Sequence, residues 1–232
     1  MLSDRLIVRV RSASDPVLEV VPDPGPAPAV ALLAGSFDPL TVGHEALARA
    51  ALSRSTVVAL VYSLGTLPKE GAGPPPLLPE RARLRVLERF CATRWGHFVG
   101  LASHGLLSEQ AEAAAERFPG AKLFLVMGSD KVLQLLDPKW YADRDAALHA
   151  LFLRAHVLYA ERAGQGGAVR DELSRPENRG WRGSFERMDV APGIAAVSSR
   201  RVRELLRRGG DARSLLPHES WEAVRSLRRT GR

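Results

Sequence analysis

Short apolar runs alternate with amphipathic stretches over most of the chain, and this alternation restricts the fold more than any other feature. An apolar run of roughly four to eight residues is typical of a buried strand, whereas apolar residues three or four apart indicate a helix. The strand-like runs lie at 29–35, 56–62, 97–103, 122–128 and 155–162. The helix-like stretches lie at 44–54, 79–92, 108–118, 198–209 and 217–229, and at least one more helix is expected between 129 and about 153.

Strands that are apolar throughout and separated by helices favour parallel pairing, with helices on both faces of the sheet. We therefore predict an α/β fold, a Rossmann-like doubly wound parallel sheet with C-terminal helices. The segment RMDVA at 187–191 is a candidate for a last strand, and the glycine-rich, charged segment 163–184 is expected to be a loop. Ser108 is expected to cap the start of its helix.

The first 28 residues differ in character from the rest. RLIVRV at 5–10 is compatible with a short strand, and VPDPGPAPA at 21–29 has four prolines in nine residues, which is typical of a stiff linker. The predicted division is an N-terminal extension, 1–28, and one domain, 29–232, long enough to bury a substantial core.

Composition excludes several protein classes. No apolar run approaches the roughly 20 residues of a membrane span. Arg5, Arg9 and Arg11 interrupt the N-terminal apolar stretch, which is therefore not a secretory signal. Cys91 is the only cysteine, so neither an internal disulfide framework nor a cysteine-built zinc site is expected. These features favour a cytoplasmic protein that does not enter membranes, and they leave open whether it is a monomer or a homo-oligomer.

The formal net charge of +7 is concentrated near the C-terminus. Residues 200–232 contain ten arginines and four acidic residues, a balance of +6. A basic surface for nucleic acid and a local anion site both fit this excess. Because no nucleic-acid-binding motif or interleaving of aromatic residues accompanies the arginines, nucleic-acid binding is not expected.

The polar run GSFDPLTVGH, residues 35–44, follows the first strand of the domain and leads directly into a helix. Ligands of open α/β sheets bind beyond the carboxyl ends of the strands. Unpaired N–H groups and the helix dipole make a helix N-terminus there a natural site for an anion. The two common phosphate fingerprints, G-x-x-x-x-G-K-[ST] and G-x-G-x-x-G after a strand, are absent. Neither H-E-x-x-H nor G-x-S-x-G occurs.

The run instead resembles the first signature of the nucleotidylyltransferase superfamily, in which a strand ends in G-[ST]-F-[DN]-P and continues to [HT]-x-G-H. VSSRRVR at 197–203 resembles the second signature, I-S-S-T-x-[IV]-R, and the resemblance covers roughly residues 29–229. Within the superfamily, GSDKVLQLLDPKWY (128–141) and ERAG (161–164) are most similar to nicotinate or nicotinamide mononucleotide adenylyltransferases.

The first motif implies a set of phosphate contacts. By resemblance, Thr41 and His44 are the catalytic pair that contacts the reacting phosphates. Gly35 and Ser36 form the turn whose backbone approaches ATP, and Gly43 allows a close backbone approach.

Two further residues of this loop have expected roles in its shape. Phe37 belongs to the ATP-binding loop but is expected to pack beneath it. Asp38 is expected to fix the turn together with Pro39, because aspartate accepts hydrogen bonds from its own local backbone and proline restricts φ.

The second motif implies a further clamp on the phosphates. Ser198 and Ser199 resemble its ATP-binding serines and also suit a helix N-cap. Arg203 is expected to act in catalysis, because its planar guanidinium offers two parallel donors to a triphosphate. Arg200 stands where the family pattern has threonine, so either the phosphate contacts differ or one cation is added.

Five more residues are candidates outside the two motifs. Gly128 and Asp130 resemble the ATP contact on the adenosine side, with a helix cap as the alternative role for Asp130. Lys69 in the second loop suits either phosphate binding or exposure to solvent. Trp140 suits either stacking on a pyridine ring or core packing, and Arg162 is a substrate-binding candidate by its place in the ERAG turn.

The resemblance implies adenylyl transfer from ATP to nicotinate or nicotinamide mononucleotide, with release of pyrophosphate. Mg²⁺ is the expected cofactor, held mainly by phosphates and not by protein ligands. The alternatives are a phosphopantetheine adenylyltransferase, a cytidylyltransferase, or a non-catalytic relative that binds a nucleotide.

Overall fold

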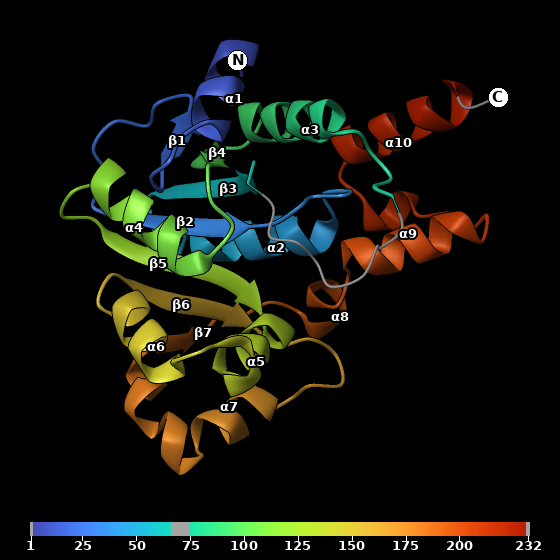
Figure 1. Cartoon of the computed structure of the whole chain (residues 1–232). Helices are drawn as coiled ribbons and strands as arrows, with labels where there is room; N and C mark the ends of the chain where they lie inside the picture. The colour runs from blue at the N-terminus through green and yellow to red at the C-terminus, as the bar shows by residue number, and fades with distance from the viewer. Residues whose placement is uncertain (1, 66–74, 231–232) are drawn as a thin grey trace.

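The computed structural model describes residues 2–65 and 75–230, and seven strands of this part of the chain form one sheet (Figure 1). Their spatial order is β1-β4-β3-β2-β5-β6-β7. Every neighbouring pair is parallel except β1 and β4, which run antiparallel. The strands are β1 (Leu18–Val21), β2 (Ala29–Ala34), β3 (Val57–Ser63), β4 (His97–Ala102), β5 (Lys122–Gly128), β6 (Ala155–Ala160) and β7 (Phe185–Arg187). The predicted α/β, Rossmann-like class is confirmed.

Helices cover both faces of the sheet because the side chains of its central strands are apolar on both sides. In β2, Ala31 and Leu33 join a core that includes residues of α2 and α3, whereas Val30 and Leu32 join a core that includes residues of α4, α5 and α6. The α-helices are α1 (Asp4–Arg11), α2 (Val42–Ala51), α3 (Glu80–Ala92), α4 (Leu107–Arg117), α5 (Ser129–Leu136), α6 (Arg144–Phe152), α7 (Ala168–Leu173), α8 (Pro192–Ala195), α9 (Ser199–Arg207) and α10 (His218–Thr230). The 3-10 helices are η1 (Pro138–Trp140), η2 (Pro176–Ser184) and η3 (Arg213–Leu215).

The order of the strands locates a crevice for a ligand. From β2 the chain builds outward through β3 and β4, and then crosses back to place β5, β6 and β7 on the other side of β2. The carboxyl ends of β2 and β5 therefore flank the point where the winding reverses, which is where open α/β sheets bind ligands. In Figure 1, α8, α9 and α10 lie beyond the end of the sheet toward which the arrowheads of β5 and β6 point.

The segment RLIVRV forms helix α1, so the predicted strand is wrong. Val10 is buried, and Leu6 and Ile7 pack against the same core cluster. Apolar residues at positions 6, 7 and 10 have the period of a helix, and the Ser3 side chain caps the helix by accepting from Leu6 N–H.

The residues before 29 also contribute to the sheet. β1 pairs with β4 from Leu18, opposite Ala102, to Val21, opposite Val99. Leu18 and Val20 are buried. The division at residue 28 remains a prediction, but the preceding residues are not merely appended to the core.

Three local expectations are also wrong. The predicted loop 163–184 contains α7 and η2, because Val169 and Leu173, four residues apart, are both buried in the core. The last strand, β7, ends at Arg187 instead of beginning there. Helix α4 begins at Leu107, so Ser108 lies inside it and Leu106 is the N-cap.

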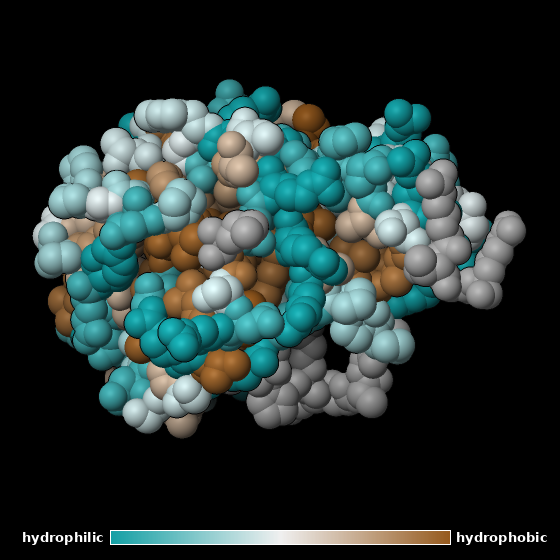
Figure 2. All heavy atoms as spheres, turned by 90° about the horizontal axis from the view of Figure 1, so that it is seen from above, coloured by the Kyte–Doolittle hydropathy of each residue, from teal (hydrophilic) through white to brown (hydrophobic). Residues whose placement is uncertain are grey.

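The surface of the described residues combines hydrophilic cover with a few exposed apolar side chains. In the view from above, hydrophilic residues form most of the rim while hydrophobic residues reach the surface nearer the middle (Figure 2). None of the described helices has both the length and the apolar character needed to cross a membrane. The large hydrophobic residues with exposed side chains are Val8, Trp95, Leu106, Trp140, Leu153 and Ile194. Two of these, Leu106 and Trp140, line one cavity.

Candidate active site

The loop after β2 is built around a buried aromatic ring. Phe37 is 1% exposed and adopts the left-handed backbone region with φ of 45°. Its ring packs edge-on against the imidazole of His44, with 5.3 Å between the ring centroids. Gly35 lies above the Phe37 ring, where an added Cβ would meet ring carbons at 3.1 Å. Phe37 therefore packs beneath the loop, as expected.

Thr41 and His44 form a reciprocal cap at the start of α2. The His44 N–H donates to Thr41 Oγ1 at 3.4 Å, and the Thr41 N–H donates to His44 Nδ1 at 3.1 Å. Because a backbone N–H can only donate, Nδ1 is the acceptor nitrogen of a neutral imidazole and Nε2 carries the hydrogen. The loop thus presents His44 as a neutral N–H donor.

Burial keeps the His44 side chain uncharged. Burial, and to a smaller extent the positive charge of Arg162, together lower the pKa of His44 from 6.5 to about 4. Arg162, which lies after β6, is therefore close enough to His44 to act on it electrostatically.

Asp38 holds a distant segment and not its own turn. Its carboxylate accepts from the N–H groups of Leu77, at 2.9 Å, and Leu78, at 2.8 Å. It is 5% exposed. The expectation that Asp38 bonds its local backbone is replaced by this contact, which ties the first motif to the residues just before α3.

The second motif packs directly against the first. Thr41 Oγ1 donates to the carbonyl of Val197 at 3.2 Å, and Ser199 Oγ donates to the carbonyl of Pro39 at 2.8 Å. Arg203 Nη1 donates to the carbonyl of Asp38 and lies 3.6 Å from its Oδ2. Three side-chain contacts therefore join two motifs that are about 160 residues apart in the sequence.

Ser198 and Arg200 stand at the beginning of α9. The Ser198 side chain is the N-cap and accepts from the N–H of Arg201. Arg200 is exposed in the first turn, and among the described residues its guanidinium has no ion-pair partner. The residue that departs from the family pattern is thus a solvent-facing cation at a helix N-terminus.

Gly43 is needed because α2 touches the backbone before α9. A Cβ at Gly43 would lie 2.3 Å from the carbonyl oxygen of Val197 and 3.0 Å from that of Ile194. Since real Cβ atoms do not approach backbone that closely, only glycine permits this packing. The close approach expected at Gly43 is therefore to the chain itself.

Gly128, Asp130 and Arg162 form a second cluster at the carboxyl end of β5. Asp130 Oδ1 lies 3.0 Å from Arg162 Nε, and the Arg162 N–H donates to Ser129 Oγ at 3.1 Å. A Cβ at Gly128 would lie 2.7 Å from Arg162 Nε and 2.8 Å from Asp130 Oδ1. Glycine at 128 thus leaves room for the ion pair, and Asp130 makes no side-chain cap at the start of α5.

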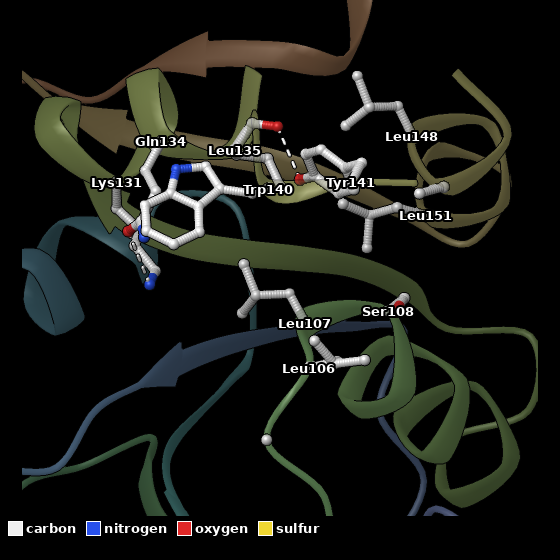
Figure 3. A pocket seen from close by; sticks show the side chains of 12 residues that line it. Leu106, Leu107, Ser108, Lys131, Gln134, Leu135, Trp140, Tyr141, Leu148 and Leu151 are labelled. Atoms are coloured by element: carbon white, nitrogen blue, oxygen red, sulfur yellow. Dashed lines mark hydrogen bonds between the residues drawn. The ribbon is translucent and has the colours of Figure 1, made fainter. Parts of the chain in front are cut away.

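Trp140 lines a cavity of about 260 Å³ between the start of α4, α5 and α6 (Figure 3). It is 52% exposed, so it is not a core residue. Leu106, Leu107 and Leu135 provide apolar wall, and Lys131 and Gln134 lie beside the indole. Lys131 and Gln134 follow Asp130 on α5, so this helix links the cavity to the Asp130–Arg162 pair. Lys69, the remaining candidate, lies outside the described residues.

Sequence reasoning missed Arg83 of α3. Its Nη1 donates to the carbonyl of Ser36 at 3.2 Å, and its guanidinium lies over the ring of Tyr62, 5.1 Å from the ring centroid. The only signal in the sequence is position: an arginine in the first turns of a helix after a parallel strand lies near the carboxyl edge of the sheet.

The described residues contain no cluster of three or more histidine, cysteine, aspartate or glutamate side chains that could hold a metal ion. The nearby carboxylates of Asp38 and Asp130 are already engaged by N–H groups and by Arg162.

A protein-family model with the description cytidylyltransferase-like matches residues 32–205. The matched segment begins within β2 and ends within α9, so it includes both motifs and all the clusters described above. No curated protein matches the chain.

Proposed function

The chain belongs to the cytidylyltransferase-like family, whose chemistry is nucleotidyl transfer, and from this premise we propose that it transfers the adenylyl group of ATP to nicotinate or nicotinamide mononucleotide. Pyrophosphate is the second product. The observation that carries the proposal is the convergence of the two motifs, in which Thr41, Ser199 and Arg203 of different segments bond one another's backbone.

This convergence supports a triphosphate site. The N-termini of α2 and α9 meet through the contact of Thr41 with Val197. Each helix start contributes backbone N–H groups and the positive end of its dipole, which together favour phosphate oxygens. We assign ATP-phosphate contacts to Gly35 and Ser36 of the first motif. In the second motif we assign them to Ser198, Ser199 and Arg200 at the start of α9.

In the proposed reaction, a phosphate oxygen of the mononucleotide attacks the α-phosphorus of ATP. One P–O bond forms, the bond to the β-phosphate oxygen breaks, and pyrophosphate leaves with the electron pair. The phosphate nucleophile is already anionic, so no general base is needed. The protein's contribution is to orient the reactants and to stabilise the added negative charge.

His44 suits the charge-stabilising role. Its neutral Nε2–H donates without a change of protonation state, because the pKa of about 4 keeps the ring uncharged at neutral pH. Arg203 supplies positive charge next to the same loop and has further N–H donors beyond the one engaged by Asp38. We propose both as catalytic, with Thr41 holding the His44 ring.

The cavity at Trp140 suits the pyridine end of the mononucleotide. An exposed indole and a wall of leucines fit a flat aromatic ring, which stacks on tryptophan with about 0.5–1.5 kcal/mol beyond its apolar burial. Gly128 and Asp130 are proposed for the adenosine side. Arg162, held by Asp130, is proposed to lie near the phosphates.

Mg²⁺ is proposed to enter as part of the substrate, MgATP. Its role is to bridge phosphate oxygens and neutralise part of their charge.

The test is pyrophosphate release by the purified full chain with MgATP and each candidate acceptor in turn. Turnover with nicotinate or nicotinamide mononucleotide is expected, and 4′-phosphopantetheine should not be used. Activity only with phosphopantetheine, or only when CTP replaces ATP, would overturn the assignment of the substrates. Tight nucleotide binding without turnover of any acceptor would instead identify a binding protein.

A further inference from the structure

One buried hydroxyl joins the segments that follow β5 and β6. Ser129 begins α5 directly after β5 and is 0% exposed. Its Oγ accepts from the Arg162 N–H at 3.1 Å and donates to Gln165 Oε1 at 2.6 Å. Arg162 and Gln165 lie in the turn after β6, which the Gln165 N–H closes by donating to the Arg162 carbonyl at 3.0 Å. Ser129 therefore anchors both ends of this turn from the neighbouring strand.

We infer that Ser129 is a positioning residue for the nucleotidyl transfer, because its hydroxyl fixes the turn that aims the Arg162 guanidinium at the phosphate site. The inference rests on the proposed function, in which Arg162 lies near the phosphates. Ser129 is itself fully buried, so it acts through Arg162 and does not touch a substrate.

The guanidinium of Arg162 lies against the backbone at the carboxyl end of β5. A Cβ at Gly128 would be 2.7 Å from Arg162 Nε and 3.3 Å from its Nη2. After burial, the positive charge of Arg162 is the second cause of the lowered pKa of His44. The charge therefore acts within range of the first motif, where its exact place affects a bound phosphate.

The side chain of Arg162 is not fixed by directional hydrogen bonding at Nε. This atom is 3.0 Å from Asp130 Oδ1, but within the described part of the chain it is buried without a hydrogen-bond partner. Such an ion pair attracts without setting one orientation, because it lacks the alignment that a hydrogen bond requires. The direction of the guanidinium therefore depends on where the backbone of Arg162 is held, and Ser129 holds it.

The turn needs this anchor because its own backbone restricts it little. The sequence AGQGG follows Arg162, and Gly164 and Gly167 have positive φ of 82° and 83°. Glycine allows more backbone conformations than any other residue. In Ser129→Ala the Arg162 N–H and Gln165 Oε1 lose their common partner, so the arginine should occupy several orientations instead of one.

Other contacts should keep the turn folded when the hydroxyl is removed. The Ala163 N–H donates to the Pro192 carbonyl at 3.3 Å, and the Gly167 N–H donates to Glu161 Oε1 at 3.1 Å. Ser129→Ala should therefore loosen the arginine without unfolding the segment. A net loss of about one hydrogen bond corresponds to a change of about five- to tenfold in binding or rate.

The test is a double-mutant cycle between Ser129→Ala and Arg162→Met, measured as kcat/KM for MgATP with the mononucleotide acceptor. Ser129→Ala should lower kcat/KM by about five- to tenfold in the wild-type chain, but by less than about twofold in Arg162→Met. Thermal melts should instead show the same loss of Tm in both backgrounds, because Ser129 bonds the backbone of residue 162, which Arg162→Met retains. A purely structural serine would lower kcat/KM equally in both.

Two further variants sharpen the cycle. Gln165→Leu removes the other partner of the hydroxyl and leaves the buried serine unchanged, so it should lower kcat/KM only when Arg162 is present. Ser174→Ala is the matched control, because this exposed serine donates from Oγ to the Arg170 carbonyl at 2.7 Å, just after α7. It should leave kcat/KM unchanged in both backgrounds.

The outcomes separate this inference from the proposed function. If neither mononucleotide were turned over, the proposed function would fail, and the same cycle in the Kd for MgATP, measured by calorimetry, would test Ser129. With either measurement, an equal effect of Ser129→Ala in both backgrounds, or no effect in the wild-type chain, would overturn the inference. Wild-type behaviour of Arg162→Met would overturn it as well, since Ser129 is inferred to act only through Arg162.

Discussion

Thr41 and His44 hold each other through their side chains and backbone, in the pattern of a capping box with histidine in the third helical position. That position is normally occupied by glutamate or glutamine, whose side chain reaches back to the N-cap N–H. Here Nδ1 accepts from Thr41, which leaves Nε2–H for another acceptor. The His44 side chain therefore both caps the start of α2 and presents its Nε2–H as a donor.

Two substitutions separate these roles. His44→Gln keeps a side chain that can complete the capping box, whereas His44→Ala leaves the Thr41 N–H without that acceptor. We expect both variants to lose about 10²–10³ in kcat, as for removal of a donor aimed at the transition state. Only His44→Ala should also lose stability, by about 0.5–2 kcal/mol. Pyrophosphate release at saturating substrate and urea unfolding on the same preparations would measure both effects. Wild-type turnover in His44→Gln would show that capping is the whole role of His44.

The partly buried, neutral His44 also predicts how stability depends on pH. Its pKa is about 4 in the folded chain and near 6.5 when unfolded, so between these values the unfolded chain binds a proton that the folded chain does not. The free energy of unfolding should therefore fall as pH falls from about 6.5 to 4, by up to about 3 kcal/mol from this residue.

The difference between the wild-type chain and His44→Gln isolates this contribution. Burial also lowers the pKa of His97, but that effect is present in both proteins and cancels. Relative to the wild type, His44→Gln should become more stable as the pH is lowered. Parallel curves of unfolding free energy against pH would contradict a neutral His44 with a lowered pKa.

Motif spacing was sufficient to place His44 in the first turn of a helix after a strand, but not to identify its tautomer. The tautomer depends on the contact of Nδ1 with the Thr41 N–H, which requires the φ of 45° at Phe37 and the packing of its ring. The partners of Asp38 were also beyond prediction, because Leu77 and Leu78 lie about 40 residues away. Local rules describe contacts within a turn, and these contacts are tertiary.

At the scale of elements, the site depends on how closely α2 and the segment before α9 approach each other. At this contact α2 has a glycine, Gly43, which has no side chain. It faces the backbone carbonyls of Val197 and Ile194. Backbone carbonyls cannot rotate away as a side chain can. A methyl group here must therefore push the two helix N-termini apart.

Gly43→Ala should lower the free energy of unfolding by about 1–3 kcal/mol, the usual cost of overpacking, and raise the KM for ATP. Gly193→Ala in α8 is the matched control, because a Cβ there meets nothing within 4 Å. The control should be neutral or slightly stabilising. Urea unfolding and steady-state kinetics would test both variants. Equal behaviour of the two would show that the contact at Gly43 does not set the distance between the phosphate-binding helices.

The elements that could be predicted from the sequence are those whose apolar pattern and length fit only one type of secondary structure. Runs such as LFLVMG at 123–128 are apolar throughout and have no helical alternative of sufficient length, and the structure confirms that they are buried strands. RLIVRV is short enough to fit either period, and only its packing as α1 decides. In 163–184, glycines and charged residues outweigh the signal of Val169 and Leu173, so the pattern indicated a loop where short helices form.

At the scale of the whole molecule, the N-terminal residues complete one edge of the sheet. β1 covers β4 with an antiparallel strand, and α1 packs Val10 into the core on one face. Without them the outer edge of β4 would present unpaired backbone groups, a template for association with other chains. The proline-rich stretch 21–29 therefore connects two parts of one sheet, although its composition is typical of a linker between independent units.

This arrangement predicts that a chain beginning at residue 29 is less stable and more prone to aggregate than the full chain. The corresponding point change is Leu18→Ala, which removes a side chain that is 4% exposed and should cost about 2–4 kcal/mol. Val8→Ala is its control, because Val8 is 63% exposed and its loss should cost no more than about 0.5 kcal/mol. Activity of the folded fraction should be retained in both variants, since β4 and β3 separate β1 from the loop after β2. Urea unfolding, light scattering and turnover of the full and shortened chains would decide the question. A shortened chain with the stability and solubility of the full chain would show that residues 1–28 are an independent extension, and the pairing of β1 with β4 would then contribute nothing to the fold.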